Sequence, residues 1–256
     1  MDKHDLSMAD FYESFYEKTT QSSVFARYCE EVFGADFSQD GLSDLQEIDD
    51  LIESAGIHKS SAVLDLGCGN GGMCEYIHRQ TGAMVHGFDY AKTAIKRAQE
   101  RTSEYPALQF SVGVFERIEY PVASFDVILS VDTMYFVDDI QGFIRQIVKW
   151  LKPHGIFAVM YGSYDKIESS IDRDMPALAQ AFQHTGYPYK VTDYTKNHFH
   201  LMKRKRKVAV SMAEDFRREG LEHIHNRILT ESIDLHMTFD EFSQHFSRFM
   251  YIVQKN

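Results

Sequence analysis

The spacing of apolar residues changes once along the chain, and this change separates two kinds of expected structure. Over residues 7–60 apolar side chains recur three or four positions apart, as in Phe11 and Phe15, which is the spacing of one helix face. A stretch rich in Gly, Asp and Ser over residues 34–44 interrupts the pattern and predicts a loop. We therefore expect an N-terminal helical cap over residues 1–60.

After the cap, short apolar runs alternate with amphipathic segments, which is the order of elements in parallel βαβ units. The runs that predict strands are 62–66, 84–89, 108–112, 125–131 and 156–161. The segments that predict helices are 71–80, 91–101 and 139–151. Right-handed crossovers between such strands give a doubly wound α/β sheet, which we expect to form a ligand-binding core over residues 61–161.

The carboxyl ends of the strands are where a doubly wound sheet binds its ligand. The segments at those ends are 65–67, 89–90, 113–116, 130–135 and 161–164. His154 lies at the opposite end of the sheet, in the turn that enters the fifth strand, so we expect it to have a structural role.

The loop after the first strand contains Gly67-x-Gly69-x-x-Gly72, and Asp89 follows at the end of the next strand. This pattern serves more than one adenosine-bearing cofactor. A nicotinamide cofactor would rest its pyrophosphate on the loop, where the carboxylate of Asp65 would repel it. S-adenosylmethionine carries an ammonium, a carboxylate and a sulfonium but no phosphate, and Asp89 suits the ribose of either cofactor. The loop thus favours S-adenosylmethionine, and a nicotinamide-dependent oxidoreductase remains the alternative.

Four motifs in this order resemble class I S-adenosylmethionine-dependent methyltransferases of the small-molecule type. They are VLDLGCGNGG (63–72), VHGFDY (85–90), SFDVILSVDTMYFVDD (124–139) and LKPHGIFAVM (151–160). The resemblance implies a Rossmann-like fold in a single domain over residues 1–256, with a seven-stranded, mostly parallel sheet whose last strand is antiparallel. The remainder, 162–256, would supply the sixth strand at 187–195, the seventh at 246–254, and a helical lid between them at about 195–243.

The resemblance also implies roles for individual residues around the cofactor. Gly67 and Gly69 would approach its methionine part, Asp65 would support that end, and Asp89 would bind the ribose hydroxyls. The remaining cofactor residues would be Tyr90, Val114 and Phe115 beside the adenine, and Ser130 at the end of the fourth strand. Val114 stands where many members of the family have an acid for the adenine amino group, which leaves Glu116 or a backbone group for that contact.

The chemistry expected of such a site is an in-line displacement at a methyl carbon. Positioning of the acceptor does most of the work, and a base is needed only where the acceptor must lose a proton. Asp132 could orient or deprotonate an acceptor, and Tyr135 could bond it or face a cation with its ring. Alternatively, Asp132 caps a turn and Tyr135 packs under the lid. The candidates for contact with the acceptor are Tyr12, Tyr16, Tyr161, His198 and His200.

The composition of the chain limits its expected binding partners, its expected location and the class of its methyl acceptor. The chain has 256 residues and a formal net charge of −11, which disfavours nucleic acid and anionic membranes as partners. No apolar run is long enough to span a bilayer, and the three cysteines do not predict a disulfide framework or a metal site, so we expect a cytoplasmic protein. SVDTMY (130–135) differs from the Asn-Pro-Pro-Tyr-type motif of nucleobase methylation.

We therefore expect a small-molecule acceptor, with an amine nitrogen or a hydroxyl or carboxyl oxygen, and S-adenosylhomocysteine as the product of the cofactor. A catalytically silent module that only binds S-adenosylmethionine is a further alternative.

Overall fold

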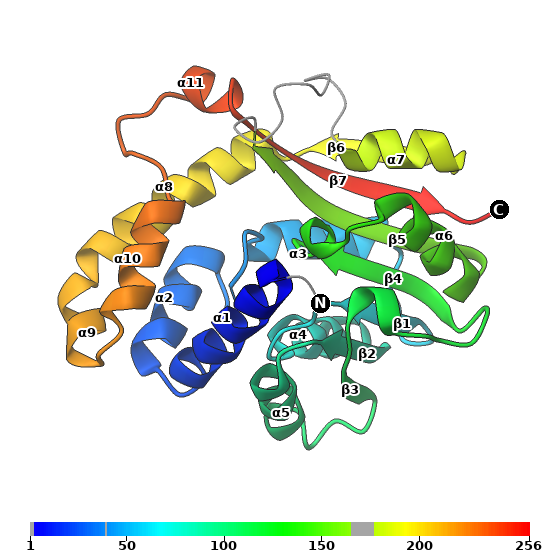
Figure 1. The fold of residues 1–256 in the computed structure, drawn as a ribbon, viewed down its shortest axis with the longest axis horizontal. Helices are drawn as coiled ribbons and strands as arrows, with labels where there is room; N and C mark the ends of the chain where they lie inside the picture. The colour runs from blue at the N-terminus through cyan, green and yellow to red at the C-terminus, as the bar shows by residue number, and fades with distance from the viewer. Residues whose placement is uncertain (1–2, 39, 165–176) are drawn as a thin grey trace.

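In the computed structural model, which describes residues 3–38, 40–164 and 177–256, a seven-stranded sheet has the order β3-β2-β1-β4-β5-β7-β6 (Figure 1). Its strands are β1 (Ala62–Leu66), β2 (Met84–Asp89), β3 (Leu108–Val112), β4 (Phe125–Val131), β5 (Leu151–Tyr164), β6 (Tyr189–Asp193) and β7 (Phe246–Gln254). The first five strands pair in parallel, whereas β7 is antiparallel to both of its neighbours, β5 and β6. The predicted doubly wound sheet with an antiparallel last strand is confirmed.

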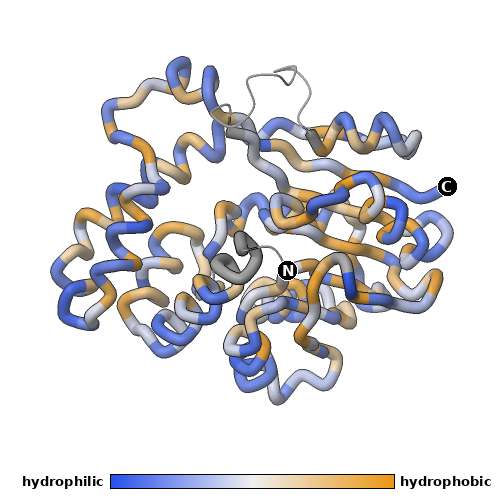
Figure 2. Tube along the Cα trace, viewed as in Figure 1, coloured by the Kyte–Doolittle hydropathy of each residue, from blue (hydrophilic) through white to orange (hydrophobic). Residues whose placement is uncertain are grey.

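Helices cover both faces of this sheet because successive residues of each strand point to opposite sides. One face packs against α3 (Leu45–Ser54), α4 (Gly72–Thr81) and α5 (Lys92–Arg101). The other face packs against α6 (Ile140–Trp150) and α7 (Ala177–Thr185). Figure 2 shows the result as apolar strands flanked by helices of alternating hydropathy. The core therefore consists of two apolar layers, one on each side of the sheet.

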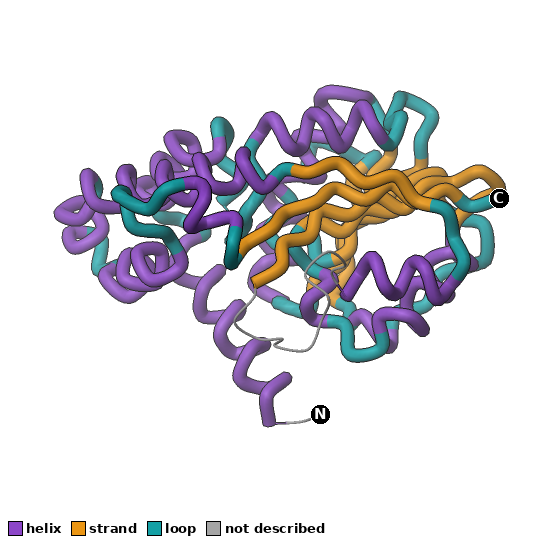
Figure 3. The backbone as a smooth tube through the Cα atoms, turned by 90° about the horizontal axis from the view of Figure 1, so that it is seen from above, coloured by secondary structure: helices purple, strands orange, loops and turns teal. Residues whose placement is uncertain are grey.

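The other helices gather beyond the end of the sheet at which β5 finishes and β7 begins (Figure 3). They are α1 (Lys3–Thr19), α2 (Ser23–Phe33), α8 (Thr195–Ser211), α9 (Ala213–Arg218), α10 (Glu222–Glu231) and α11 (Phe239–Ser243). An apolar cluster of their own joins α1 and α2 to α8, α9 and α10, with Phe15, Val32 and Phe216 among its members. Helices α1 and α2 of the N-terminal cap and the insertion before β7 therefore form one helical layer, whereas α3 packs on the sheet.

The beginning of β5 differs from the sequence prediction. The strand begins at Leu151 instead of Ile156, and the expected turn lies inside it. Phe125 pairs with Leu151, but Val127 pairs with Ile156, so β5 has three more residues than β4 between these pairs. His154 lies there with φ of +61°. The turn residues predict a strand that starts at Ile156, which is wrong, because they form a bulge inside a strand that starts at Leu151.

Candidate functional site

The glycine loop between β1 and α4 is tied to the end of β2 by backbone hydrogen bonds. The N–H groups of Gly67 and Cys68 both donate to the Phe88 carbonyl, at 2.9 Å. Gly67 has φ of +78°, and a Cβ placed there would lie 2.6 Å from Cγ2 of Thr133. A larger residue would therefore be strained and would push the loop away from the end of β4. The glycine keeps bare backbone at the carboxyl ends of the central strands.

Asp89 ends β2 and receives two further backbone hydrogen bonds. Its Oδ2 accepts from Gly69 N at 3.0 Å, and its Oδ1 accepts from Ala91 N at 2.9 Å. Burial raises the pKa of Asp89 to about 6, although these N–H bonds act in the opposite direction. An ionised carboxylate has about four acceptor positions, so the side chain can accept from a ligand hydroxyl as well.

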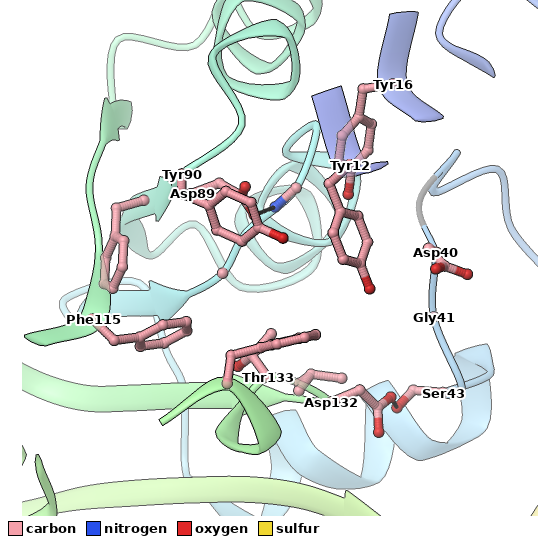
Figure 4. Close-up of a pocket in the computed structure, with 15 residues that line it drawn as sticks. Tyr12, Tyr16, Asp40, Gly41, Ser43, Asp89, Tyr90, Phe115, Asp132 and Thr133 are labelled. Carbon is pink, nitrogen blue, oxygen red and sulfur yellow. Dashed lines mark hydrogen bonds between the residues drawn. The ribbon is translucent and has the colours of Figure 1, made fainter. Parts of the chain in front are cut away.

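A pocket with about 640 Å³ of empty space lies beside Asp89, at the carboxyl ends of β1, β2 and β4 (Figure 4). Tyr12 and Tyr16 reach into it from α1. The other lining residues are Asp40, Gly41, Ser43, Gly67, Gly69, Phe88, Asp89, Tyr90, Phe115, Val131, Asp132, Thr133 and Phe136. In Figure 4, Asp89, Tyr90 and Phe115 lie on one side and Asp40, Ser43 and Asp132 on the other. We refer to these two groups as the cofactor side and the acceptor side.

The structure brings eight of the predicted site residues into this pocket and leaves seven outside its lining. Those in the lining are Tyr12, Tyr16, Gly67, Gly69, Asp89, Tyr90, Phe115 and Asp132. Those outside it are Asp65, Val114, Ser130, Tyr135, Tyr161, His198 and His200. Glu116, the other residue considered for the adenine, has a side chain outside the described part of the structure.

Thr133 takes the place in the lining that was predicted for Ser130. Ser130 is fully buried, and its hydroxyl lies 2.7 Å from Oγ1 of Thr133. Thr133 in turn donates to the Leu66 carbonyl, also at 2.7 Å. The serine therefore supports the threonine from behind, and only the threonine reaches the pocket.

Asp65 lies behind the glycine loop. It is 1% exposed, and its Oδ2 accepts a hydrogen bond from Sγ of Cys74 at 3.1 Å. Its Oδ1 has no hydrogen-bond partner among the residues that the structure describes. Burial raises the pKa of Asp65 to about 7. Support of the cofactor by this residue would therefore act through the loop, and it stays a prediction.

Asp132 is held by Arg248, a fully buried cation on β7 that the sequence analysis did not single out. The guanidinium donates to Oδ1 of Asp132 at 2.7 Å and to Oδ2 at 3.1 Å. The Nε of Arg248 donates to Glu47 on α3 at 2.9 Å. The hydroxyl of Ser43 is a further donor to Asp132. Asp132 is therefore a fixed, paired carboxylate in the pocket wall, and its predicted role of orienting or deprotonating an acceptor stays a prediction.

One buried cation shared by two carboxylates leaves a surplus of negative charge. Burial raises the pKa of Glu47 to about 7, against the opposing effect of Arg248. Burial alone would lower the pKa of Arg248, but Asp132 and Glu47 raise it well above its ordinary value. The guanidinium stays charged, and Glu47 is the member of the network that takes up a proton near neutral pH.

Tyr135 and Tyr161 pack together beside the pocket. Their ring centroids are 4.7 Å apart, and the Tyr135 hydroxyl accepts from Gly162 N at 2.6 Å. The hydroxyl also lies 3.4 Å from Asp132. The alternative in which Tyr135 has a packing role thus describes its position better than direct contact with an acceptor.

The two histidines of the predicted lid lie on α8, outside the pocket lining, and the lid itself stays a prediction. His198 is buried against Phe242, and burial lowers its pKa well below the ordinary value. His200 is exposed beside the ring of Phe199. The described lining includes no residue from 195–243, and its residues outside the 61–161 core come from α1 and from the loop before α3. The composition of that loop predicts only turns, and it carries no signal for the pocket residues Asp40, Gly41 and Ser43.

The described residues contain no group of three or more His, Cys, Asp or Glu side chains placed to hold a metal ion. Within the same residues, the structure has no helix with the length and apolar character needed to cross a membrane.

Comparison with known proteins places this geometry in context. Residues 64–159 match a family profile described as "Methyltransferase domain". Over 150 residues the chain is 30% identical to phosphoethanolamine N-methyltransferase of Plasmodium falciparum. This alignment covers 57% of this chain and 55% of that protein. Over 122 residues it is 34% identical to a sterol 24-C-methyltransferase of Aspergillus fumigatus. This alignment covers 45% of this chain and 32% of that protein. The chain thus spans about half or less of the length of these relatives.

A solved structure extends the similarity of fold to nearly the whole chain. Phosphoethanolamine N-methyltransferase 2 of Haemonchus contortus, in complex with phosphomonomethylethanolamine and S-adenosylhomocysteine, superposes with a TM-score of 0.74 at 18% identity. The superposition covers 95% of this chain and 60% of that one. The described fold is therefore the Rossmann-like fold of class I methyltransferases, which confirms the predicted fold class.

Proposed function

We propose that this protein, whose residues 64–159 match the methyltransferase-domain profile, transfers a methyl group from S-adenosylmethionine to a small-molecule acceptor, with an amine nitrogen as the preferred target. The observation that carries the proposal is the division of one pocket into two sides. The cofactor side offers a diol-binding carboxylate and two rings, and the acceptor side offers carboxylates beside tyrosines.

The residues on the cofactor side fit S-adenosylmethionine. Asp89 would bind the ribose hydroxyls with its remaining lone pairs, and Tyr90 and Phe115 would flank the adenine. The bare backbone at Gly67 and Gly69 lets the methionine part approach the loop closely. When bound, the cofactor supplies an electrophilic methyl carbon on a sulfonium.

The hydrogen bonds of the loop argue against a pyrophosphate. The N–H groups of Gly67, Cys68 and Gly69 already donate to Phe88 and Asp89 within the protein. Those of Gly71 and Gly72 donate to the Cys68 carbonyl and to the side chain of Asn70. A pyrophosphate needs several free N–H groups at such a loop. These occupied donors disfavour the nicotinamide alternative.

The acceptor side suits a nitrogen that enters as a cation. The Tyr12 ring stands edge-on to the rings of Tyr90 and Phe136, at centroid distances of 5.9 and 6.0 Å. Burial raises the pKa of Tyr12, with a further contribution from Asp40, so its hydroxyl stays neutral. The aromatic faces and the Asp40 carboxylate favour an ammonium group. The nitrogen must shed a proton before it attacks the methyl carbon. Asp40 and Asp132 are each paired with an arginine, Arg227 and Arg248, so both would orient the nitrogen as fixed carboxylates.

Calorimetric titration tests the cofactor assignment. S-adenosylmethionine, S-adenosylhomocysteine and NADH are titrated in parallel into the protein, into Asp89→Ala and into Asp126→Ala. Asp126, at the other end of β4, is the control because it bonds Ala62 N and Lys152 instead of the pocket. We expect micromolar binding of both adenosyl compounds, weakened about a hundredfold by Asp89→Ala alone, since two charge-assisted hydrogen bonds are lost. Binding of NADH alone would refute the proposal.

A further inference from the structure

Helix α5 begins directly after the cofactor-side residues Asp89 and Tyr90, and it has no side-chain cap of its own. Its N-cap residue is Ala91, which makes no side-chain hydrogen bond, and its first turn contains no acidic residue. The first N–H groups of a helix have no partner within the helix, and their partial positive charge favours a carboxylate. The N-terminus of α5 therefore needs a partner from another part of the chain.

Glu13 on α1 is that partner. Its two carboxylate oxygens accept from Lys92 N at 2.6 Å and from Thr93 N at 3.0 Å. Partial burial alone would raise the pKa of Glu13, but the hydrogen bonds from Thr93 and Lys92 lower it below its ordinary value, so the side chain is charged at neutral pH. The bonded residues are 79 and 80 positions apart, so the same carboxylate caps α5 and fastens α1 to it.

This cap is continuous with the backbone that holds Asp89. Ala91 N donates to Oδ1 of Asp89 at 2.9 Å, and the next two N–H groups along the chain donate to Glu13. Successive N–H groups are thus divided between a carboxylate of the pocket and a carboxylate of α1. Movement of α1 would release the two that bond Glu13 and loosen the segment that carries Asp89 and Tyr90.

Glu13 also lies between the two tyrosines that α1 contributes to the pocket. Tyr12 precedes it, and Tyr16 follows within one helical turn. The Tyr12 ring stands edge-on to that of Tyr90, and Tyr16 is only 4% exposed. Both tyrosines come from α1 in Figure 4, so a shift of this helix would move both rings relative to the cofactor side.

The contacts of α1 differ in strength along the helix. Phe15 packs in the apolar cluster of the helical layer, where its ring centroid lies 5.5 Å from that of Phe25 on α2. Glu13 is partly exposed, and water competes for its bonds with α5. The bonds of Glu13 can therefore open while the apolar contacts of Phe15 keep α1 attached.

We propose that Glu13 is a positioning residue for the cofactor: its cap on α5 holds Tyr12 and Tyr16 beside the cofactor side, and release of the cap lets S-adenosylmethionine enter and S-adenosylhomocysteine leave. The inference rests on the proposed function for the identity of these two ligands. Tyr12 and Tyr16 form the wall of the pocket on the α1 side, so a ligand that passes there requires α1 to move. Glu13 is not part of the described lining and acts only through α1.

The dissociation rate of S-adenosylhomocysteine tests the proposal, measured by surface plasmon resonance with the full chain. Glu13→Ala removes both acceptor oxygens, and we expect the rate to rise about tenfold. Glu13→Gln keeps one uncharged acceptor, and the rate should rise about threefold. Glu17→Ala is the matched control, since Glu17 is exposed on the same helix and its loss changes the net charge equally. In this control the rate should change less than about twofold.

Lys92→Pro tests the same contact from the side of the donor and leaves α1 unaltered. Lys92 is the first residue of α5, where proline is favoured, and the backbone of Ala91, with φ of −75° and ψ of 110°, is compatible with a following proline. The substitution removes the N–H that donates to Glu13 and should raise the dissociation rate about threefold, whereas Lys92→Ala keeps this N–H and should not. Added to Glu13→Ala, Lys92→Pro should have no further effect, because the bond is already lost.

The contrary results separate this inference from the proposed function. Equal dissociation rates in Glu13→Ala and Glu17→Ala would overturn the role of Glu13 and leave the proposed function standing. Additive effects of Glu13→Ala and Lys92→Pro, or equal rates in Lys92→Pro and Lys92→Ala, would overturn it as well. Failure of the unsubstituted protein to bind either adenosyl compound would refute the proposed function, and the role of Glu13 with it.

Discussion

The cofactor side and the acceptor side meet in one pocket but are built in different ways. The cofactor side comes largely from a single βαβ unit, in which residues 67–91 bond one another mostly through backbone groups. The acceptor side gathers Tyr12, Asp40 and Asp132 from three distant segments, and Arg248 on β7 supports it from behind. One side is therefore fixed by local chain geometry, and the other by side chains that meet only in the finished fold.

The two sides also treat buried charge differently. Asp89 accepts from backbone N–H groups, whereas Asp132 and Glu47 share one guanidinium as their counter-charge. A backbone donor survives every substitution except proline, whereas a guanidinium is lost with its side chain. The acceptor side should consequently be the more sensitive of the two to single side-chain changes.

The largest effect that would test this difference is expected from Arg248→Met. The substitution leaves two buried carboxylates without their cation, and we expect the free energy of unfolding at pH 8 to fall by about 3–5 kcal/mol. Urea unfolding followed by circular dichroism measures it. Arg218→Met is the control, because that side chain is 72% exposed and its loss should change stability by less than about 0.5 kcal/mol. Equal losses in both variants would show that the network does not hold the acceptor side together.

A smaller effect is expected on the cofactor side from Asp65→Asn, and it should depend on pH. The pKa of Asp65 is about 7 in the folded protein against an ordinary 3.8, so the folded state binds the extra proton between these values. Stability due to this group is therefore present at low pH and is lost as pH rises through about 7. We expect Asp65→Asn to raise the free energy of unfolding at pH 8 by about 1–3 kcal/mol and to change it little at pH 5.

Asp126→Asn provides the control of opposite sign for that experiment. Lys152 and Ala62 N hold the pKa of Asp126 below its ordinary value, against the effect of partial burial. Its contribution is present above the ordinary pKa and is lost as pH falls, so this variant should be destabilised at pH 8. A gain of stability in both variants would show that loss of net negative charge, and not burial of Asp65, is the cause.

The smallest effect concerns the boundary between the two sides. Asp40→Asn removes a carboxylate that faces the proposed amine, and we expect KM for the acceptor to rise about tenfold while the Kd for S-adenosylhomocysteine changes less than about twofold. Steady-state kinetics and calorimetry give the two numbers. Asp49→Asn is the control, since Asp49 bonds Tyr76 at an exposed site on α3. Parallel changes in both constants would show that the sides are not separable.

The difference between the two sides of the pocket also explains which parts of the structure the sequence predicts. The bounds of β1 to β4 and of β7 coincide with apolar runs that end at turn residues, and the glycine loop is a local motif. Both signals lie within a few consecutive residues. The start of β5 escaped prediction because a bulge and a turn use the same residue types.

The missed residues of the acceptor side carry no local signal. Glu47 and Arg248 are 201 positions apart, and nothing in either neighbourhood indicates an ion pair. Asp40 lies in a stretch whose composition predicts only a loop, and the same composition is compatible with a site. The residue type of His198 and His200 suggested contact with the acceptor. In the fold, however, His198 is buried on α8 and His200 is exposed to solvent. Such features depend on tertiary packing, which spacing along the chain does not encode.

The place of β7 in the sheet also affects the order in which the protein can be completed. β7 follows all other strands along the chain, yet it pairs with both β5 and β6 and carries Arg248. During synthesis, β1 to β5 leave the ribosome while this strand is still missing. Until β7 arrives, the carboxylates of Asp132 and Glu47 lack the cation that pairs with them in the finished protein. The cofactor side can be assembled during translation, whereas the acceptor side must wait for β7.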